Sequence, residues 1–510
     1  MSRFFLMCAL CCLALGGLAQ DGRVRWTDEV RLDRDDRAVS LMQATDSTFT
    51  FRHDRSSTDS PFMVLEHFHA SSLTPTWTRP VDLPGGLPSG ARFIDMYPVG
   101  PLWVAAFDHT DRKEKRHSMH VAALNPDGLW LGPAREAHFR KYDKYENRTY
   151  EVFTSADSTR LVGHLAGPFG KEELAEHALV VLDADLEPLY TRELVLPYSD
   201  DQLRVRDLLL DTQGNIHLYA AQPRPKVRLD SQRAVEERKN HTLFSYYWKS
   251  NTLKELEIDL QTQWITDARV AFTPGGAIGV AGLYSNGPYF RTKGIFGLVL
   301  EPVSRRILSQ GLVQLPKETI DGFSSRRRSD GGREITNLYL DHALFPTDTT
   351  WTLVAEQFEV VERVSTDPAT GRQIITYSYR YEDILVATGG ANNALLGTTQ
   401  VRKSQAITVD PEWYSSYTCI PRRGGITLLF NDHPDNGTLD GDARSLVGLR
   451  KVSVRRVDVA RSGVQNRTEV DFMGEDGPNF RPELFLELGS RGVVLFGQYK
   501  RTYRLGILDF

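Results

Sequence analysis

The chain has very little cysteine for its 510 residues. Cys8, Cys11 and Cys12 lie close to the N-terminus, and Cys419 is the one cysteine in the rest of the sequence. A disulfide framework needs paired cysteines spread along the fold. We therefore expect no internal disulfide in the folded part, which must be stabilised by apolar burial. Cys419, in a strand-like run, is expected to be a small core residue.

Long apolar runs and a charge of one sign are also absent. Only residues 4–15 are continuously apolar, which excludes a protein that crosses a membrane many times. The 61 Lys and Arg residues nearly balance the 66 Asp and Glu residues, for a net charge of −5. This balance argues against nucleic acid as a partner. Hydrophobic residues at 41% and aromatic residues at 10% exclude a disordered chain.

The N-terminal residues 1–19 have the pattern of a signal peptide. Arg3 supplies the positive start, residues 4–15 the apolar segment, and Gly17-Leu18-Ala19 a small-x-small cleavage site. No cysteine follows the pattern of a bacterial lipoprotein signal. The sequence thus predicts a chain exported to the periplasm or the exterior, with residues 20–510 as one folded domain and no membrane span in the mature chain.

Short β-type runs recur from end to end and are bounded by Gly, Pro, Asn or Asp. Clear examples are residues 103–107, 178–182, 216–220, 278–283 and 425–430. Runs of this length between turn dipeptides such as Asp127-Gly128 are typical of strands and tight turns. Helical patterns are few, and residues 171–177 and 231–239 are the best helix candidates.

These runs form a repeat of about 50–75 residues with four strands in each unit, which predicts the blades of a β-propeller. Expected closing strands are residues 75–83 (PTWTRPVDL) and 188–196 (PLYTRELVL), with weaker versions at 306–315 and 401–409. The expected units begin near Val39, Phe93, Tyr150, Val205, Ile265, Ile335, Tyr417 and Leu484.

The two ends of the chain favour a closed ring. Residues 24–32 (VRWTDEVRL) resemble a closing strand without a preceding unit, while the C-terminal unit, from Leu484, has room for only three strands. We therefore expect the N-terminal strand to complete the last blade, which removes the open sheet edges. The prediction is an all-β single propeller of eight blades, with seven as the near alternative. Two or three separate β-sandwich domains are the other possibility, although no linker divides the chain.

Motifs for catalysis are missing from the sequence. It contains no Gly-x-Ser-x-Gly elbow, no His-Glu-x-x-His, no phosphate-binding loop and no sialidase-type Asp box. No metal site is assigned. The acidic segment 431–442 offers oxygen donors for calcium, but its spacing does not fit an EF-hand, and a turn-rich hairpin loop explains it better. Two arginine-rich loops, at 224–239 and 324–333, could capture an anionic group.

The densest group of polar and aromatic residues lies in the C-terminal half. Tyr377, Tyr379 and Tyr381 alternate, so on a strand they share one side and could form a platform for a sugar or peptide. Packing between blades is the alternative explanation. The candidate binding residues are Tyr284, Asn286, Tyr377, Tyr379, Tyr381, Asp383, Lys403, Gln405, Tyr414, Tyr417 and Asp432.

The order of these motifs resembles a family of uncharacterised exported proteins of Bacteroidota. The resemblance rests on Gly282-Leu283-Tyr284-Ser285-Asn286, Lys293-Gly294-Ile295-Phe296, Tyr379-Arg380-Tyr381-Glu382-Asp383, Lys403-Ser404-Gln405, Tyr414-Ser415-Ser416-Tyr417 and Phe430-Asn431-Asp432, within residues 205–440. It implies export and no established activity. Members usually carry an Asn-type residue where Glu382 stands here.

Two functions remain open from the sequence. The first is a monomeric binding or assembly module for an envelope protein or a glycan, suggested by the repeat and the lack of catalytic motifs. The second is a propeller-fold glycoside hydrolase or lyase acting on an anionic polymer, suggested by the arginine loops and the tyrosine row. The side chains that line the central channel should distinguish them.

Overall fold

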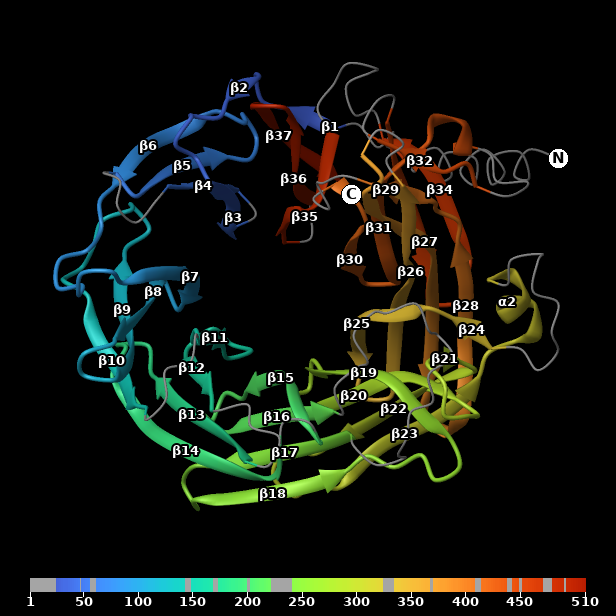
Figure 1. Cartoon of the computed structure of the whole chain (residues 1–510), viewed down its shortest axis with the longest axis horizontal. Coiled ribbons are helices and arrows are strands. Elements are labelled where there is room, and N and C mark those ends of the chain that lie inside the picture. Colours follow the sequence, from blue (N-terminus) through green and yellow to red (C-terminus); the bar gives the residue numbers. More distant parts are fainter. Residues whose placement is uncertain are drawn as a thin grey trace, which may run out of the picture.

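The computed structural model describes residues 24–45, 47–55, 61–142, 148–167, 173–199, 202–221, 241–323, 334–366, 370–408, 414–437, 443–448, 452–470, 479–489 and 492–510. The expected signal peptide and the expected helix at 231–239 lie outside these residues. Within them the chain forms eight main β-sheets that surround a central channel as the blades of a β-propeller (Figure 1).

The first strand of each blade lies nearest the channel and the later strands lie further out (Figure 1). Blade one contains β3 (Ala38–Ala44), β4 (Thr48–Asp54), β5 (Met63–His69) and β6 (Pro75–Val81), and blade two contains β7 (Arg92–Val99), β8 (Leu102–Asp111), β9 (Arg116–Leu124) and β10 (Arg135–Lys141). Blade three contains β11 (Glu151–Thr154), β12 (Leu161–Ala166), β13 (Leu174–Leu182) and β14 (Pro188–Ser199). Blade four contains β15 (Arg204–Leu210), β16 (Ile216–Ala221), β17 (His241–Tyr247) and β18 (Thr252–Glu257).

Blades five to eight follow the same order with additions in blade six. Blade five contains β19 (Trp264–Phe272), β20 (Ile278–Ser285), β22 (Gly294–Leu300) and β23 (Ile307–Gln314). Blade six contains β25 (Leu338–Thr347), β26 (Thr350–Thr366), β27 (Gln373–Gly390) and β28 (Ala394–Val401), and is extended by β29 (Gln405–Ile407) and β32 (Leu446–Val447). Blade seven contains β30 (Thr418–Arg422), β31 (Gly425–Asp432), β33 (Ser453–Ala460) and β34 (Gln465–Val470), and blade eight contains β35 (Asn479–Leu488), β36 (Gly492–Tyr499) and β37 (Thr502–Asp509). The connection between blades five and six carries α2 (Lys317–Gly322) and β24 (Ile335–Thr336), and β24 pairs with β21 (Arg291–Thr292), which lies between β20 and β22 of blade five. The short helices η1 (Ala391–Asn393) and η3 (Pro434–Gly437) form turns in blades six and seven.

The N-terminal strand closes the ring, as the sequence predicts. β1 (Val24–Trp26) pairs antiparallel with β37, so that Trp26 lies opposite Gly506. β2 (Val30–Arg31) pairs with the other end of the same strand. Between them, the Thr27 amide donates a hydrogen bond of 2.8 Å to the Leu505 carbonyl oxygen. The first and last parts of the described chain therefore build one blade together.

Each predicted unit start lies within five residues of the start of a blade's first strand, but two local expectations are wrong and one helix is missing from them. Residues 173–177 of the expected helix 171–177 are not helical, because β13 begins at Leu174, and residues 171 and 172 lie outside the described part of the chain. The closing strand of blade six is β28, which ends at Val401 where the sequence places its start. Strand β27 runs on to Gly390, and the turn at η1 places β28 directly after it. The short helix α2 was not predicted at all.

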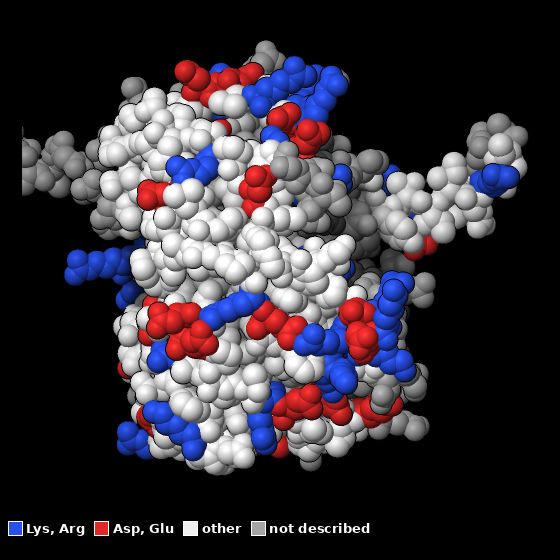
Figure 2. Space-filling view, turned by 90° about the vertical axis from the view of Figure 1, so that its left-hand side faces the viewer, with Lys and Arg blue, Asp and Glu red and all other residues white. Residues whose placement is uncertain are grey.

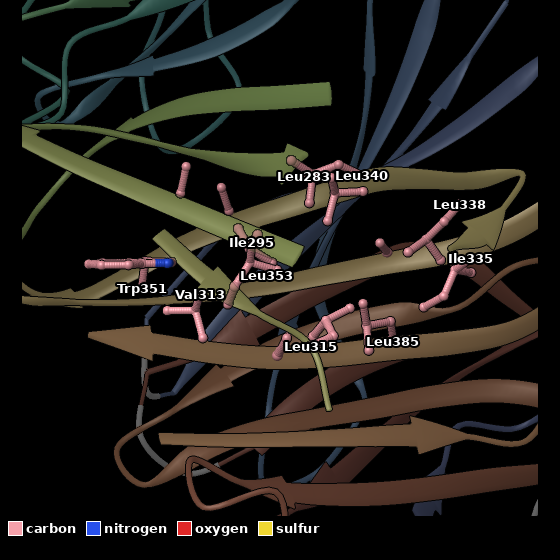
Figure 3. Packing of buried hydrophobic residues seen from close by; sticks show 14 of the residues in the cluster. Leu283, Ile295, Val313, Leu315, Ile335, Leu338, Leu340, Trp351, Leu353 and Leu385 are labelled. Atoms are coloured by element: carbon pink, nitrogen blue, oxygen red, sulfur yellow. The ribbon is translucent and has the colours of Figure 1, made fainter. Parts of the chain in front are cut away.

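The hydrophobic core lies in layers between neighbouring blades. The largest cluster joins blades five and six, where Leu283, Ile295 and Val313 face Leu340 and Leu353 (Figure 3). Such interleaving of two sheets is how a propeller buries its apolar faces without a separate central core. Cys419 lies in a similar cluster between blades six and seven and is a free, buried thiol, as expected.

Trp351 fixes the contact between blades five and six. Its indole ring is fully buried and lies in a pocket formed by glycines. A Cβ atom on Gly297 would come within 2.2 Å of Trp351 Cδ2, and Gly311 and Gly389 lie similarly close to the ring. Glycine is needed at these positions because the sheet backbone approaches the indole directly.

The outer surface carries mixed charge. On the side drawn in Figure 2, Lys and Arg side chains alternate with Asp and Glu, separated by uncharged surface. This agrees with the near-neutral balance of the sequence. No helix among the described residues is long and apolar enough to cross a membrane.

Candidate functional site

The two faces of the propeller can be told apart by the direction of the inner strands. We call the face at which the inner strands begin the start face, and the face at which they end the end face. In each blade the inner strand runs toward the end face and the second strand returns. In blade six, Thr350 pairs with Thr347 near the end face, and Gln357 pairs with Leu338 at the start face.

Four inner strands carry an aspartate at a β-bulge close to the start face. In β7, β15 and β19 the aspartate directly follows the extra residue of the bulge, and in β25 it is the extra residue. A bulge re-aims the side chains next to it. These residues are Asp95, Asp207, Asp267 and Asp341. The sequence signal, an aspartate three or four positions into each of these units, was available but was missed.

Three of these aspartates link blades through arginine. Asp95 forms an ion pair of 2.7 Å with Arg52 of blade one. Asp207 of blade four receives a hydrogen bond of 3.2 Å from Arg269 of blade five.

Asp267 connects three blades at once. It accepts from Arg206 of blade four at 3.4 Å and from the Leu340 amide of blade six at 2.9 Å. Its side chain is fully buried. This carboxylate therefore fixes the relative positions of blades four, five and six.

Asp341 is exposed to solvent, as is half of the Asp95 side chain, whereas Asp267 is buried. The Tyr417 hydroxyl donates a hydrogen bond of 2.7 Å to Asp341 from blade seven. Although it reaches solvent, the surrounding blades desolvate it in part, and this raises its pKa to about 7. The charges of Glu356 and Asp267 also raise that pKa, while Tyr417 and Arg269 lower it. The channel mouth thus contains a carboxyl group that can gain or lose a proton near neutral pH.

Lys403 and Gln405 lie in a buried polar network, not on an open surface. Lys403 is fully buried and forms an ion pair with Glu356, which is itself 4% exposed. The Lys403 ammonium also donates to Gln405 Oε1 at 3.0 Å. Gln405 in turn donates to the Asn431 carbonyl oxygen at 2.7 Å. The network connects blade six to blade seven.

The same network continues toward blade eight. The side-chain amide of Asn431 donates to the carbonyl oxygens of Tyr414, at 2.8 Å, and Phe480, at 2.7 Å. Tyr414 and Tyr417 are both buried. These candidate binding residues therefore hold blades six, seven and eight together, and their use as a ligand surface stays a prediction.

The two candidate aspartates in this region face arginines. Asp383 receives a hydrogen bond of 3.1 Å from Arg402. Asp432 is fully buried and forms an ion pair with Arg467, with Arg455 at 3.9 Å. Asp432 is therefore paired with arginines instead of presenting open carboxylate oxygens to a calcium ion.

The other described residues of segment 431–442 also give no support for a calcium site. Asp435 forms an ion pair with Arg444, and residues 438–442 lie outside the described part of the chain. The described residues contain no group of three His, Cys, Asp or Glu side chains arranged for a metal. The two arginine-rich loops, 224–239 and 324–333, also lie outside the described residues.

Tyr284 and Asn286 lie apart from the other candidates, in blade five. Tyr284 is buried beside Gly294, where an added Cβ would come within 2.4 Å of the ring. Burial and the charge of Glu334 raise its pKa to about 12. The Asn286 amide donates to Glu334 Oε1 at 2.7 Å. The structure does not bring these two residues into the Lys403 network.

The three alternating tyrosines lie on a two-stranded arm that extends from blade six. Strands β26 and β27 continue paired beyond the bulge at Glu356 and Phe358, up to the pair Thr366 and Gln373. We call residues 358–366 and 373–381 the arm. It leaves the propeller at the start face, beyond Leu338, where pairing with the inner strand ends.

One face of the arm is mostly apolar, with Glu362 as its one charged residue. Because side chains alternate along a strand, residues 358, 360, 362 and 364 share a face with their partners 381, 379, 377 and 375. That face contains Phe358, Val360, Glu362, Val364, Ile375, Tyr377, Tyr379 and Tyr381. Near the propeller the face continues into an aromatic row, with ring centroids 4.9 Å apart for Phe358 and Tyr381 and 5.9 Å apart for Tyr339 and Phe358.

The outer part of this apolar face is solvent-exposed. Val364 is 56% exposed, Ile375 51% and Tyr377 45%. No described strand pairs with the outer edges of 360–366 or 373–378. The sequence predicted the tyrosine row but not the arm that carries it.

A Ser–His–Asp arrangement occurs in blade four but has no access to substrate. His217 Nδ1 lies 3.0 Å from the Ser245 hydroxyl, and His217 Nε2 lies 3.6 Å from Asp211. His217 and Ser245 are both fully buried. A nucleophile must be able to reach its substrate, so this group is a structural hydrogen-bond network inside the blade.

Comparisons with known proteins assign no family to the chain. No protein-family model matches the chain, and no curated protein matches it. Among solved structures it is similar to the WD40 domain of SCAP from fission yeast, at 10% identity and a TM-score of 0.38, over 96% of this chain and 98% of that one. It is also similar to Kluyveromyces lactis Hsv2, at 11% identity and 0.30, over 67% and 85%. A protein of unknown function from Bacteroides caccae matches at 10% identity and 0.26, over 61% and 83%. The chain is a β-propeller, as its own sheet order shows.

Proposed function

We propose that this β-propeller is an exported binding module that docks a partner protein through the apolar face of its arm. The observation that carries the proposal is the exposed set Val364, Ile375 and Tyr377 on a ribbon that projects from the start face. Export is supported by the signal pattern of residues 1–19 and by the resemblance to exported proteins of Bacteroidota.

The arm needs a partner for a physical reason. An isolated two-stranded hairpin is at best marginally stable in water, because it buries too little apolar surface. The outer part of the arm, residues 360–366 and 373–378, leaves its apolar side chains exposed and has no described strand on either edge, whereas β29 pairs with Tyr379–Tyr381 at the base. A partner would cover the aliphatic and aromatic side chains and could pair with an open edge.

A protein fits this face better than a glycan does. The tyrosines are interleaved with Val360, Val364 and Ile375, which offer apolar area but no hydrogen bonds for sugar hydroxyls. Aromatic and aliphatic anchors of this kind form the centres of protein interfaces. The opposite face of the arm carries the Arg380–Glu359 ion pair and is more polar, although Val361 and Ile374 also lie on it.

A matched set of variants tests the proposal. The triple variant Val364→Ser, Ile375→Ser, Tyr377→Ser removes the apolar face, while Ile374→Ser changes an equally exposed residue (49%) of the opposite face. Wild type and Ile374→Ser should capture the same protein from an envelope extract and re-form a stoichiometric complex with it after purification. The triple variant should lose that complex while its melting curve stays unchanged.

Other outcomes of the same experiment would contradict the proposal. Equal capture by the triple variant would show that the arm is not the docking surface. Loss of glycan-array binding in the triple variant, without any protein partner, would replace the protein by a glycan. Self-association that disappears in the triple variant would make a second copy of this chain the partner.

A second candidate function is favoured by Asp341. An exposed carboxyl with a pKa of about 7, next to Tyr417 and Arg269, has the properties of a general acid or base for a glycoside hydrolase or lyase acting on an anionic polymer. Turnover of such a polymer that is abolished by Asp341→Asn would support this function. Absence of turnover across a panel of anionic polysaccharides would leave the binding module as the better account.

A further inference from the structure

The channel holds a cavity near the end face, away from the arm. Its volume is about 510 Å³, and it is lined by residues of the inner strands of blades two to five. The lining includes Tyr97, Phe153, Leu209 and Phe272, which come from β7, β11, β15 and β19. All four lie in the last part of their strands, whereas the bulge aspartates lie in the first part.

The lining of the cavity is uncharged and combines apolar side chains with polar groups. None of the described residues that line the cavity carries a charge. The nearest bulge carboxylates are held by arginines, Asp95 by Arg52 and Asp207 by Arg269. A charged ligand would lose its hydration in this cavity without gaining a partner of opposite sign.

The apolar side chains at this site are incompletely covered by protein. Tyr97, Phe153, Leu209 and Phe272 are each only partly buried, although neighbouring Leu210 is 1% exposed. A few polar groups stand beside them, among them the hydroxyls of Thr154 and Ser158 and the phenol of Tyr97. Cavities of about 300–1,000 Å³ with mostly apolar walls and a few polar groups are typical of small-molecule sites.

We propose that this end-face cavity binds an uncharged small molecule with an aromatic or alicyclic ring. The ring would lie among Phe153, Leu209 and Phe272, and the phenol of Tyr97 and the hydroxyl of Thr154 would orient its polar substituents. Burial and the charge of Asp95 raise the pKa of Tyr97 above its usual value of 10, so its hydroxyl stays protonated and can donate. The site is concave and built from four blades, which suits a small molecule better than a protein surface.

This site is independent of the proposed docking arm, because the two lie at opposite faces. Fluorescence titration of the full chain with uncharged N-phenyl-1-naphthylamine measures it directly. We expect saturable binding of one probe per chain. The anionic analogue 8-anilinonaphthalene-1-sulfonate should bind at least about tenfold more weakly, because the lining offers no cation.

Variants assign the binding to the cavity. Leu209→Trp should fill the space and weaken probe binding by at least about tenfold, and Phe272→Ala gives a second variant that enlarges the cavity and alters the probe's emission maximum. The triple arm variant should bind the probe as wild type does. Binding that does not saturate, that favours the anionic probe, that is unaffected by both cavity variants or that is lost with the arm variant would overturn the proposal.

Discussion

Replacing Lys403 tests whether the polar network between blades six and seven stabilises the ring. Lys403→Met keeps most of the side-chain length but removes the ammonium that pairs with Glu356. The Glu356 carboxylate, 4% exposed, would then keep only the hydrogen bond of 2.8 Å from the Ser416 hydroxyl. Removing one partner of a buried ion pair costs about 3–5 kcal/mol, because the other charge stays desolvated without compensation.

The second substitution of the pair should recover much of that loss. Glu356→Gln removes the negative charge but retains a hydrogen-bond acceptor, so the double variant no longer buries an isolated charge. If the two substitutions acted independently, the double variant would be less stable than Lys403→Met alone. We expect it to be more stable than Lys403→Met, because the two effects are coupled. Urea denaturation followed by tryptophan fluorescence gives the free energy of unfolding for each member of the cycle.

An exposed lysine supplies the control. Lys317 is 80% exposed in its side chain and pairs with Asp321 at 3.4 Å on α2. Lys317→Met should change the free energy of unfolding by less than about 0.5 kcal/mol. The reasoning would be refuted if Lys403→Met costs no more than Lys317→Met, or if adding Glu356→Gln lowers stability further.

Two further predictions concern other parts of the ring. Burial lowers the pKa of His53, but hydrogen bonds to Asp36 and Glu66 and the charges of these two carboxylates raise it to about 9. The protonated His53 therefore stabilises the fold by up to about 3 kcal/mol. This stabilisation is complete below pH 6.5 and is lost as the pH rises through 9. A stability–pH profile in which His53→Gln shows the same fall as wild type would contradict this. Gly297→Ala would place a Cβ 2.2 Å from Trp351 and should cost about 1–3 kcal/mol. Gly85→Ala, where nothing lies within 4 Å, should be nearly neutral, so equal melting curves for the two glycine variants would rule out the packing argument.

The blades could be predicted from the sequence because their signal is local. Each blade consists of short alternating runs joined by tight turns, so the positions of the first strands follow from turn residues and hydrophobic periodicity. The closure also follows from the ends of the chain, since residues 24–32 look like a strand without a preceding unit. Neither inference needs knowledge of contacts between distant residues.

The details of blade six could not be predicted in this way. Strands β26 and β27 have 17 and 18 residues, far longer than the usual five or six. The closing strand expected at 401–409 is too late, because η1 turns the chain directly from the end of β27 into β28 at Ala394. Residues 171–177 contain Lys171, Glu172 and Glu173, which favour a helix, but pairing with the neighbouring strands decides the structure of this segment from Leu174 onward.

The candidate site was only partly accessible from the sequence because it depends on three-dimensional pairing. The tyrosine row follows from alternation alone, and β27 contains all three residues. The burial of Lys403 next to Glu356 cannot be inferred, since the two residues are far apart in the chain and meet only when blade six is complete. The bulge aspartates carry a repeated signal, but their arginine partners come from other blades and have no fixed spacing.

Amide hydrogen exchange of the two terminal segments tests the closed ring most directly. If β1 and β2 complete blade eight, amides in residues 24–31 that bond to β37 exchange slowly. Residues 502–509 should then be protected on both edges, like the central strand β36. Exchange of residues 24–31 at the rate of an unfolded chain, together with edge-strand exchange in residues 502–509, would contradict closure of the propeller by its N-terminal strand.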